Sequence, residues 1–283
     1  MPLDQTTIEQ FRTHELIIRA SGRGTQPPFR ETIIAWSDGL NASPEATQAL
    51  NRCFTFLEGE GKLRDGIMEI DRTTLFTSIE KNLFPRSRFL LQMIWGYAGD
   101  HRGPQRVAAY FNSDSDIVGG YEKYQRVVSD ISIGRLPEAF SALCSVEGLS
   151  TSFATKVLYF ESRNKVDEYA LILDDRVAAG LLKITSPFAA ESISASAPRP
   201  FITQKSGPRA RSKQIAFAWH KYWFYVKGLH EVARELGCEA ENIELFLFDR
   251  GGKPSTKKQA RTKANVDNEL QSAVADFLAE EGK

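Results

Sequence analysis

The amino-acid sequence predicts a mainly α fold. Apolar residues recur at steps of three and four along most of the 283 residues, which is the spacing of helices that bury one face. Hydrophobic residues make up 42% of the chain and charged residues 25%, proportions that are typical of a globular protein. A chain of this length can build one large core or two lobes.

Three helices are expected in the N-terminal third. Apolar residues from Ile8 to Ile17 form one helical stripe, those from Ala46 to Leu57 a second, and those from Phe89 to Tyr97 a third. We therefore expect an N-terminal helical region.

A stretch just after the third stripe combines aromatic and basic side chains. Trp95-Gly96-Tyr97 comes before His101-Arg102-Gly103-Pro104. Aromatic rings beside arginines can stack an extruded base and pair with phosphates. The candidate base pocket therefore consists of Trp95, Tyr97 and Arg102. The alternative is a helix end, followed by a new helix that begins at Pro104.

The most informative pattern lies between residues 136 and 160. Leu136 to Val146 predicts an apolar helix, Gly148 a tight turn, and Phe153 to Phe160 a second helix. Gly148 can adopt a positive φ without a Cβ penalty. Backbone N–H groups at the start of the second helix can hold an anion such as a DNA phosphate. Three helix-capping residues follow the glycine: Ser150, Thr151 and Ser152.

A carboxylate follows at the start of another expected helix. The run Leu171-Ile172-Leu173 is apolar, and Asp174 comes directly after it. An aspartate at this position is a natural N-cap for a helix from Arg176 to Lys183. The capping role and a chemical role are compatible.

The C-terminal third contains one long expected helix. Its apolar residues repeat from Ile215 to Leu236, and Gly237 is placed to end it as a C′ glycine. The aromatic residues of this helix are expected to pack in the core. Residues 243–248 fit a helix or a strand, and residues 186–208 predict a long connection rich in Ser, Ala and Pro. Residues 266–278 predict an amphipathic tail helix that docks on the body or binds a partner.

Composition excludes several classes of protein. The formal net charge is zero, so contact with DNA requires basic residues to gather on one face, as in the clusters at 205–213 and 253–263. These clusters could equally be solvated loops. The three cysteines cannot supply the four ligands of an iron–sulfur cluster, and the four histidines lack metal-ligand spacing, so no metal or other cofactor is expected. A signal sequence and an 18-residue apolar stretch are both lacking, which predicts a cytoplasmic protein that does not associate with membranes.

The motifs of residues 146–177 resemble those of the helix-hairpin-helix DNA glycosylases, specifically the bacterial 8-oxoguanine-glycosylase-like branch. In that family a lysine on the second hairpin helix is the amine nucleophile, and an aspartate in an Asp-x-x-apolar turn stands opposite it. The resemblance makes Lys156 the nucleophile and Asp174, 18 residues later, the aspartate. It covers about residues 85–250 and implies two helical lobes with a cleft between them.

The nucleophile position has an alternative, because the hairpin departs from the family pattern Leu-Pro-Gly-Val-Gly-x-Lys. Aligned strictly on Gly148, Ser152 takes the nucleophile position, and the enzyme would have no lyase step. The run Thr155-Lys156-Val157 and the spacing to Asp174 favour Lys156.

The carboxylate has an alternative as well. Asp175 is a second candidate. Val177 fits the apolar place of a turn that begins at Asp174, so the pattern favours Asp174.

The resemblance implies an enzyme that flips a modified base out of double-stranded DNA and excises it, with a lyase step through Lys156 as an option. The expected DNA-binding residues are those of the hairpin and the following helix: Gly148, Ser150, Thr151, Ser152 and Arg176. Some bacterial members remove modified bases such as glucosylated hydroxymethylcytosine from phage DNA, and this antiphage role is the leading expectation for the substrate. Repair of 8-oxoguanine and a non-catalytic DNA-binding module are the alternatives. We expect a monomer.

Three regions are expected along the chain. They are an N-terminal helical region over 1–84, a glycosylase-like core over 85–250 with the hairpin at about 136–162, and a basic linker with a C-terminal amphipathic helix over 251–283.

Overall fold

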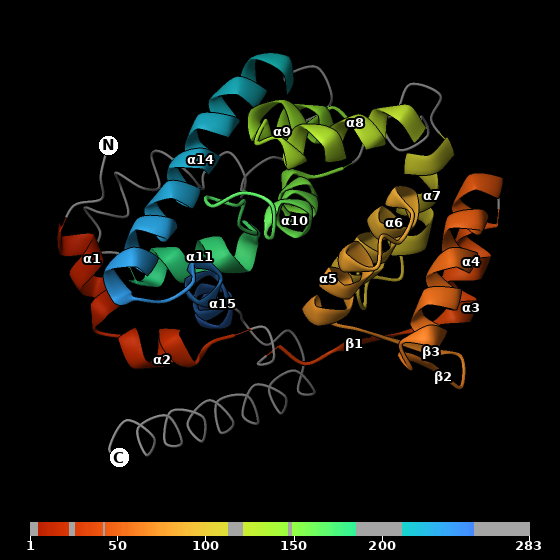
Figure 1. Ribbon diagram of the computed structural model, residues 1–283, viewed down its shortest axis with the longest axis horizontal. Coiled ribbons are helices and arrows are strands. Elements are labelled where there is room, and N and C mark those ends of the chain that lie inside the picture. Colours follow the sequence, from red (N-terminus) through yellow and green to blue (C-terminus); the bar gives the residue numbers. More distant parts are fainter. Residues whose placement is uncertain are drawn as a thin grey trace. The chain divides into compact units, whose positions relative to one another are not determined.

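The computed structural model confirms the mainly α fold class (Figure 1). It describes residues 5–22, 26–41, 43–112, 121–146, 149–184 and 211–251. The expected connection at 186–208, the tail helix at 266–278 and the side chains of both basic clusters lie outside the described residues. None of the helices in the described ranges is both long and apolar enough to cross a membrane.

Two compact units make up the chain. The unit that carries Lys156, here the lysine unit, comprises residues 26–170 and 208–215. The unit that carries Asp174, here the aspartate unit, comprises residues 1–25, 171–207 and 216–283. The region boundaries expected at residues 84 and 250 remain predictions.

The lysine unit begins with a small antiparallel sheet that the helical periodicity did not predict. Its strands are β1 (Phe29–Thr32), β2 (Leu63–Arg64) and β3 (Ile67–Ile70), in the order β1-β3-β2. Asp65 and Gly66 join β2 to β3 with positive φ angles of 52° and 72°. Two such residues form the hairpin turn whose twist matches that of the strands it connects.

Eight helices of the lysine unit lie in its described ranges. The predicted helices at 46–57 and 89–97 are confirmed by α4 and α6. Ser43 caps α4 by accepting a hydrogen bond from the Ala46 N–H, and Asp71 caps α5 through the Thr74 N–H. The bounds are α3 (Ile33–Leu40), α4 (Pro44–Gly59), α5 (Arg72–Glu80), α6 (Pro85–Gly96), α7 (Gly103–Asn112), α8 (Tyr121–Ser132), α9 (Leu136–Cys144) and α10 (Thr151–Ser162).

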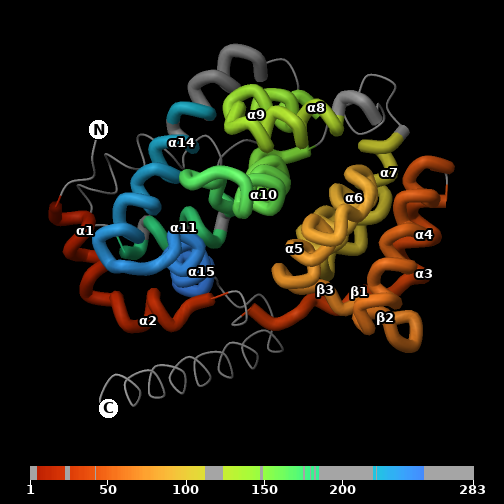
Figure 2. Tube along the Cα trace, in the orientation of Figure 1, coloured from red at the N-terminus to blue at the C-terminus, as the bar shows by residue number. Residues whose placement is uncertain are grey.

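Helix α10 is the central element of this unit. Every residue from Ala154 to Ser162 is buried, and the helix packs against α5, α6, α8 and α9 (Figure 2). A helix that is enclosed on this many sides holds its side chains in fixed positions, because protein cores are close-packed. Helices α9 and α10 confirm the two helices of the predicted hairpin.

The aspartate unit contains most of α14 (Arg211–Leu236), from residue 216 on. Its other helices are α1 (Gln5–Arg12), α2 (Glu15–Ala20), α11 (Asp175–Ile184) and α15 (Ala240–Gly251). The helix expected across residues 8–17 is instead two helices, which a turn at Thr13 and His14 separates. The run at 243–248 is helical, within α15. Gly237 ends α14 as predicted, with a φ of 63° and the Cys238 N–H donating to the Ala233 carbonyl at 3.0 Å.

Two glycines let α11 and α15 approach until their backbones touch. A Cβ added to Gly180 would lie 1.9 Å from the Leu247 carbonyl oxygen, and one added to Gly251 would lie 1.6 Å from the Arg176 carbonyl oxygen. Any side chain at either position would therefore force the two helices apart.

Candidate active site

The hairpin between α9 and α10 leaves the first turn of α10 without a side-chain cap. The Ser150 carbonyl accepts hydrogen bonds from the N–H groups of Phe153 and Ala154, both at 3.0 Å, whereas its hydroxyl makes no capping bond. The first N–H groups of a helix have no acceptor within the helix, and here they belong to Thr151 and Ser152. Gly148 lies outside the described residues, so its role in the turn remains a prediction.

Lys156 lies in the second turn of α10, surrounded by aromatic rings. Its side chain packs so closely that the residue is only 8% exposed. The Nζ atom lies 4.7 Å from the centroid of the Phe153 ring and 5.9 Å from that of Trp95. A cation over the face of an aromatic ring is attracted by the ring's electrons. The amine therefore sits among flat π surfaces.

Gly96, at the end of α6, makes room for this arrangement. A Cβ at this position would lie 2.6 Å from Cε1 of Phe153 and 3.5 Å from Cδ of Lys156. The first of these distances is a clash and the second is ordinary contact. The absence of a side chain at Gly96 thus lets the first turn of α10 lie against the end of α6.

Two of the three predicted base-pocket residues lie beside Lys156. Tyr97 stacks on Phe153 with ring centroids 4.0 Å apart and an interplanar angle of 24°. Trp95 and Tyr97 are each 5% exposed, and the buried Nε1 of Trp95 has no hydrogen-bond partner in the part of the chain that the structure describes.

Arg102 does not join this group. Its side chain is 59% exposed and pairs with Asp100, with Nε and Oδ1 3.3 Å apart. The backbone around it matches the alternative interpretation of the stretch, because α7 begins at Gly103 with Pro104 in its first turn. Arg102 therefore stands at a solvated helix start in the described part of the chain.

A buried arginine that the sequence analysis missed lies against the same tryptophan. Arg72 is 1% exposed, and its Cζ lies 5.7 Å from the Trp95 centroid and 5.1 Å from that of Tyr159. Its Nε donates to the side-chain oxygen of Gln26 at 3.0 Å. No sequence motif marks this arginine, because its partners are far away along the chain.

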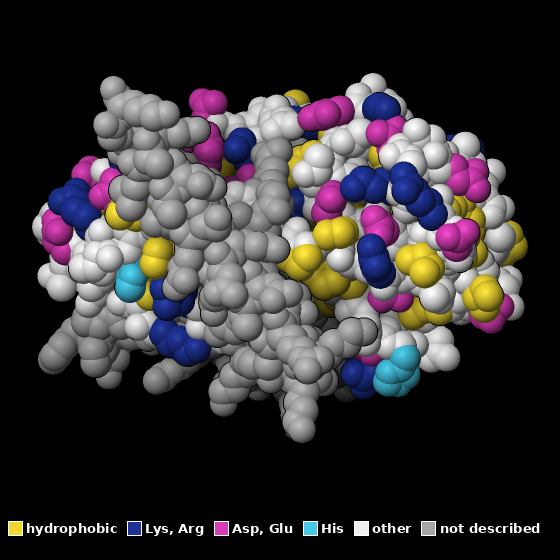
Figure 3. All heavy atoms as spheres, turned by 90° about the horizontal axis from the view of Figure 1, so that it is seen from below, with side chains coloured by type: hydrophobic (Ala, Val, Ile, Leu, Met, Phe, Trp, Pro, Cys, Tyr) yellow, Lys and Arg dark blue, Asp and Glu magenta, His cyan; other side chains and the backbone are white. Residues whose placement is uncertain are grey.

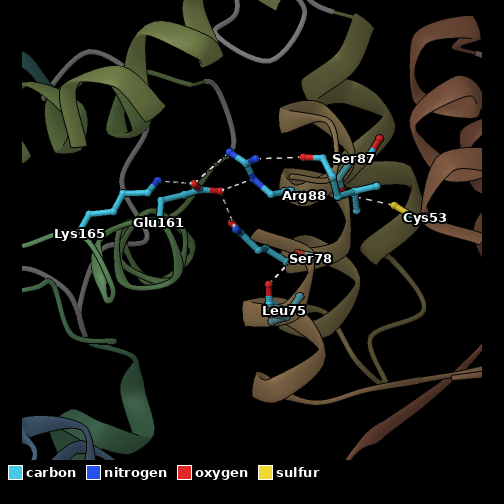
Figure 4. A network of polar contacts seen from close by, with 9 residues as sticks. Cys53, Leu75, Ser78, Ser87, Arg88, Glu161 and Lys165 are labelled. Atoms are coloured by element: carbon cyan, nitrogen blue, oxygen red, sulfur yellow. Dashed lines mark hydrogen bonds and ion pairs between the residues drawn. The ribbon is translucent and has the colours of Figure 1, made fainter. Parts of the chain in front are cut away.

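An ion pair buried in the lysine unit joins α10 to α6 (Figure 4). Arg88 on α6 donates twice to Glu161 on α10, from Nε at 3.0 Å and from Nη2 at 3.1 Å. Gln92 and Lys165 also donate to this carboxylate, both at 3.3 Å. Glu161 is fully buried and lies five residues after Lys156 on the same helix. The pair therefore fixes the helix that carries Lys156 against the helix that carries Trp95.

Asp174 caps α11, as the sequence predicts. Its Oδ1 accepts hydrogen bonds from the N–H groups of Arg176 and Val177, both at 3.0 Å. The carboxylate thus lies at the positive end of the helix dipole and is partly exposed. The side chain of Asp175, the first residue of α11, is outside the described set.

The strand-like run before Asp174 is held by two tyrosines of α14. The Tyr222 hydroxyl accepts from the Leu171 N–H at 3.2 Å and donates to the Leu171 carbonyl at 2.8 Å. The Tyr225 hydroxyl donates to the Ile172 carbonyl at 2.9 Å. Both tyrosines are buried, which confirms that they pack in the core.

Arg176, the remaining predicted DNA contact, is exposed on the first turn of α11. Its Cζ lies 3.7 Å from the centroid of Phe248. Burial lowers the pKa of its guanidinium, although Asp174 and Asp249 act in the opposite direction. Contact with DNA phosphates through Arg176, as through the hairpin residues, remains a prediction.

The described residues form no metal site, and the face shown in Figure 3 has no patch of a single charge sign. Among them, no three His, Cys, Asp or Glu side chains come together to hold a metal ion. On the face shown in Figure 3, Lys and Arg side chains are interspersed with Asp and Glu. Lys156 and Asp174 belong to different units, so their opposition across a site remains a prediction.

Comparisons with known proteins give one match. The family model described as "Putative 8-oxoguanine DNA glycosylase OGG-like protein" matches residues 23–248. No curated protein and no solved structure matches the chain. The matched range includes the hairpin, the residues around Lys156, and Asp174.

Proposed function

The chain belongs to the OGG-like DNA glycosylase family, and on this premise we propose that it excises a modified base from double-stranded DNA with Lys156 as the amine nucleophile. DNA glycosylase activity in general follows from the family. The observation that supports Lys156 is its position on the second hairpin helix, where its Nζ lies among aromatic rings. A base extruded from a duplex can stack on such rings.

Asp174 is proposed to serve the reaction in two ways. A lysine amine with a reference pKa of about 10.4 is protonated at neutral pH, so its attack requires a base that accepts the proton. A carboxylate can take that proton and can also stabilise the positive charge that develops on the sugar as the glycosidic bond breaks. Its place as a helix cap fixes the position of the carboxylate at the start of α11.

The Lys156 nitrogen forms a bond to C1′ of the sugar, the bond from C1′ to the base breaks, and the base leaves with the electron pair and acquires a proton. The nitrogen lone pair then breaks the bond from C1′ to the ring oxygen, which takes up a proton, and a protonated imine results. In the proposed lyase step, a carboxylate or water removes a proton from C2′, a double bond forms between C2′ and C3′, and the 3′ phosphate leaves with the electrons of its bond to C3′. If Lys156 does not attack, Asp174 would activate water and the product would be an abasic site.

Borohydride trapping tests the nucleophile. Borohydride reduces an imine between lysine and C1′ to a stable amine, which links protein and DNA covalently. We expect a trapped complex with the natural chain and none with Lys156→Gln. Lys165→Gln is the control, because Lys165 is a nearby lysine that donates to Glu161 and is not placed at the reaction. Base release at the natural rate in Lys156→Gln would mean that the enzyme acts through water.

The substrate is proposed to be a base enlarged by modification, with glucosylated hydroxymethylcytosine in phage DNA as the leading choice. This proposal rests on the antiphage activity of some relatives of this branch and on no residue of this chain. The assay compares phage DNA that carries this base, a duplex that contains 8-oxoguanine, and unmodified DNA. We expect release from the first alone. Preference for 8-oxoguanine would mean that the enzyme acts in DNA repair and not in antiphage defence. Binding to the three DNAs without release of a base would favour a non-catalytic DNA-binding module.

A further inference from the structure

We propose that Phe153 occupies, in the unliganded protein, the place that the extruded base takes on Tyr97. The base would displace the Phe153 ring, stack on Tyr97 in its stead, and so reach Lys156. This inference rests on the proposed role of Lys156 as the nucleophile. It assigns to Tyr97 the task of binding a flat nucleobase and to Phe153 the task of covering the site.

The Phe153 ring has the two neighbours that the extruded base would need, a stacking surface and the Lys156 amine. One face stacks on Tyr97, with ring centroids 4.0 Å apart and planes within 24° of parallel. The Lys156 Nζ lies 4.7 Å from the same ring. A nucleobase that a lysine is to release must likewise have a flat surface to stack on and an amine beside it.

The burial of the amine requires that some group move before any nucleotide is attacked. Lys156 is 8% exposed, and Tyr97 and Trp95 are 5% exposed. Phe153 is more exposed than these three, and it is therefore the outer member of the group. An attacking atom has to come within about 3–3.5 Å of its target, which is impossible for an amine that side chains enclose.

Phe153 is the member of the group that can move. Tyr97 is held by a hydrogen bond between its hydroxyl and that of Tyr110, 2.8 Å apart. Trp95 is held by edge contacts with Phe29 and Phe160. Phe153 belongs to the first turn of α10, which the Ser150 side chain does not cap.

Two further features fit a space built for an exchangeable ring. Gly96 provides that space, because a Cβ there would lie 2.6 Å from the Phe153 ring. The buried Nε1 of Trp95 is a donor with no acceptor among the described residues. Buried donors are rarely left without an acceptor, so an oxygen or nitrogen acceptor on the incoming nucleotide is a suitable partner for it.

The first experiment measures how accessible the Lys156 amine is, without any DNA. Formaldehyde and dimethylamine borane methylate exposed lysine amines, and mass spectrometry of peptides gives the rate at each lysine. We expect Phe153→Ala to raise the methylation rate of Lys156 several-fold and to leave that of Lys165 unchanged. Phe29→Ala is the matched control, because Phe29 also contacts Trp95 and is also partly exposed.

A second variant guards against a loss of folding in Phe153→Ala. Gly96→Ala keeps the phenylalanine but pushes its ring away, so it should raise the methylation of Lys156 as well. An unchanged rate at Lys156 in both variants would overturn the proposal. Because methylation involves no base release, this result stands even if Lys156→Gln excises bases normally and the proposed function is wrong.

The second experiment identifies the surface on which the base stacks. In the Lys156→Gln background, a duplex with 2-aminopurine at the target position reports stacking, because stacking quenches its fluorescence. Tyr97→Ala should lose the quenching. Phe153→Ala should keep it and bind the duplex several-fold more tightly, because no ring has to be displaced. Loss of quenching in Phe153→Ala, or binding that is no tighter, would mean that Phe153 is itself the platform or a structural residue.

Discussion

The two units hold their proposed catalytic residues by different physical means. Lys156 is positioned by side chains, namely the aromatic rings around it and the Arg88–Glu161 pair on its helix. Asp174 is positioned by the backbone, through two N–H groups of α11. The helix α11 is in turn in backbone contact with α15 at Gly180.

This difference indicates where each unit tolerates change. A site built from packed side chains can be altered in small steps, since neighbouring groups repack around a substitution. Close contact between two backbones allows few substitutions near it. The Asp174 side chain itself is only partly buried. Lys156 is thus enclosed by side chains that can repack, whereas Asp174 is held by backbone groups and is partly exposed.

The largest expected effect comes from breaking the ion pair of the lysine unit. Glu161→Ala leaves the Arg88 guanidinium buried without its carboxylate, and removal of one partner of a buried pair costs about 3–5 kcal/mol of unfolding free energy. Urea denaturation, with hydrogen exchange of α6 and α10, measures this loss.

The control for this experiment removes both charges. Arg88→Met combined with Glu161→Met should recover most of the stability, because an apolar pair of similar volume often replaces a buried ion pair without loss. Equal destabilisation in the single and double variants would show that the volume of these side chains matters more than their charge.

Substitution of Gly180 tests how strongly the aspartate unit depends on the contact between α11 and α15. In Gly180→Ala the new Cβ would lie 1.9 Å from the Leu247 carbonyl oxygen, so α11 and α15 must separate. Overpacking of a core costs about 1–3 kcal/mol, and we expect the upper end because the obstacle is backbone. The melting temperature and the rate of base release should both fall. Gly59→Ala is the control, since a Cβ there meets nothing within 4 Å and a helix prefers alanine.

Two substitutions of Asp174 separate its capping role from its chemical role. Asparagine caps helices as well as aspartate does, so Asp174→Asn should retain stability and lose base release. Asp174→Ala should lose base release and, in addition, about 1 kcal/mol of stability. Unimpaired base release in Asp174→Asn, with a loss in Asp175→Asn, would transfer the catalytic role to Asp175.

The smallest expected effect concerns the cap of α5 in the lysine unit, Asp71. Burial raises the pKa of this carboxyl, but hydrogen bonds from the Thr74 N–H and hydroxyl, together with Lys62, outweigh burial and hold the pKa below its usual value. The stabilisation is therefore complete above the unfolded pKa of about 3.9 and is lost as pH falls through the lower folded value. Urea midpoints between pH 2 and pH 6 should fall less steeply towards acid in Asp71→Asn than in the natural chain.

Local sequence patterns predicted the parts of the site that local interactions create. The α9–α10 hairpin, the Asp174 cap and the C′ glycine at 237 all depend on residues within a few positions of one another. The turn at Thr13 and His14 was missed because an apolar stripe can run on across two successive helices. The small sheet was missed because its strands have two to four residues, too few for a clear alternation.

The surroundings of Lys156 could not be predicted in the same way. Phe153 appeared only as the first apolar residue of a helix, and its stacking on Tyr97 depends on how α10 meets the end of α6. Arg72 and Glu161 carried no motif, because their partners lie 46 and 73 residues away in sequence. Contacts of this kind arise from packing, which a pattern of single residues does not encode.

The contact between α11 and α15 also bears on how the family should be compared. Gly180 and Gly251 exclude every other residue type at their positions for purely steric reasons. In a survey that scores all substitutions of this chain for activity, these two positions would rank beside the catalytic residues in intolerance. Glycine at both positions would therefore indicate that another protein has the same packing of α11 and α15, and would not indicate that it catalyses the same reaction.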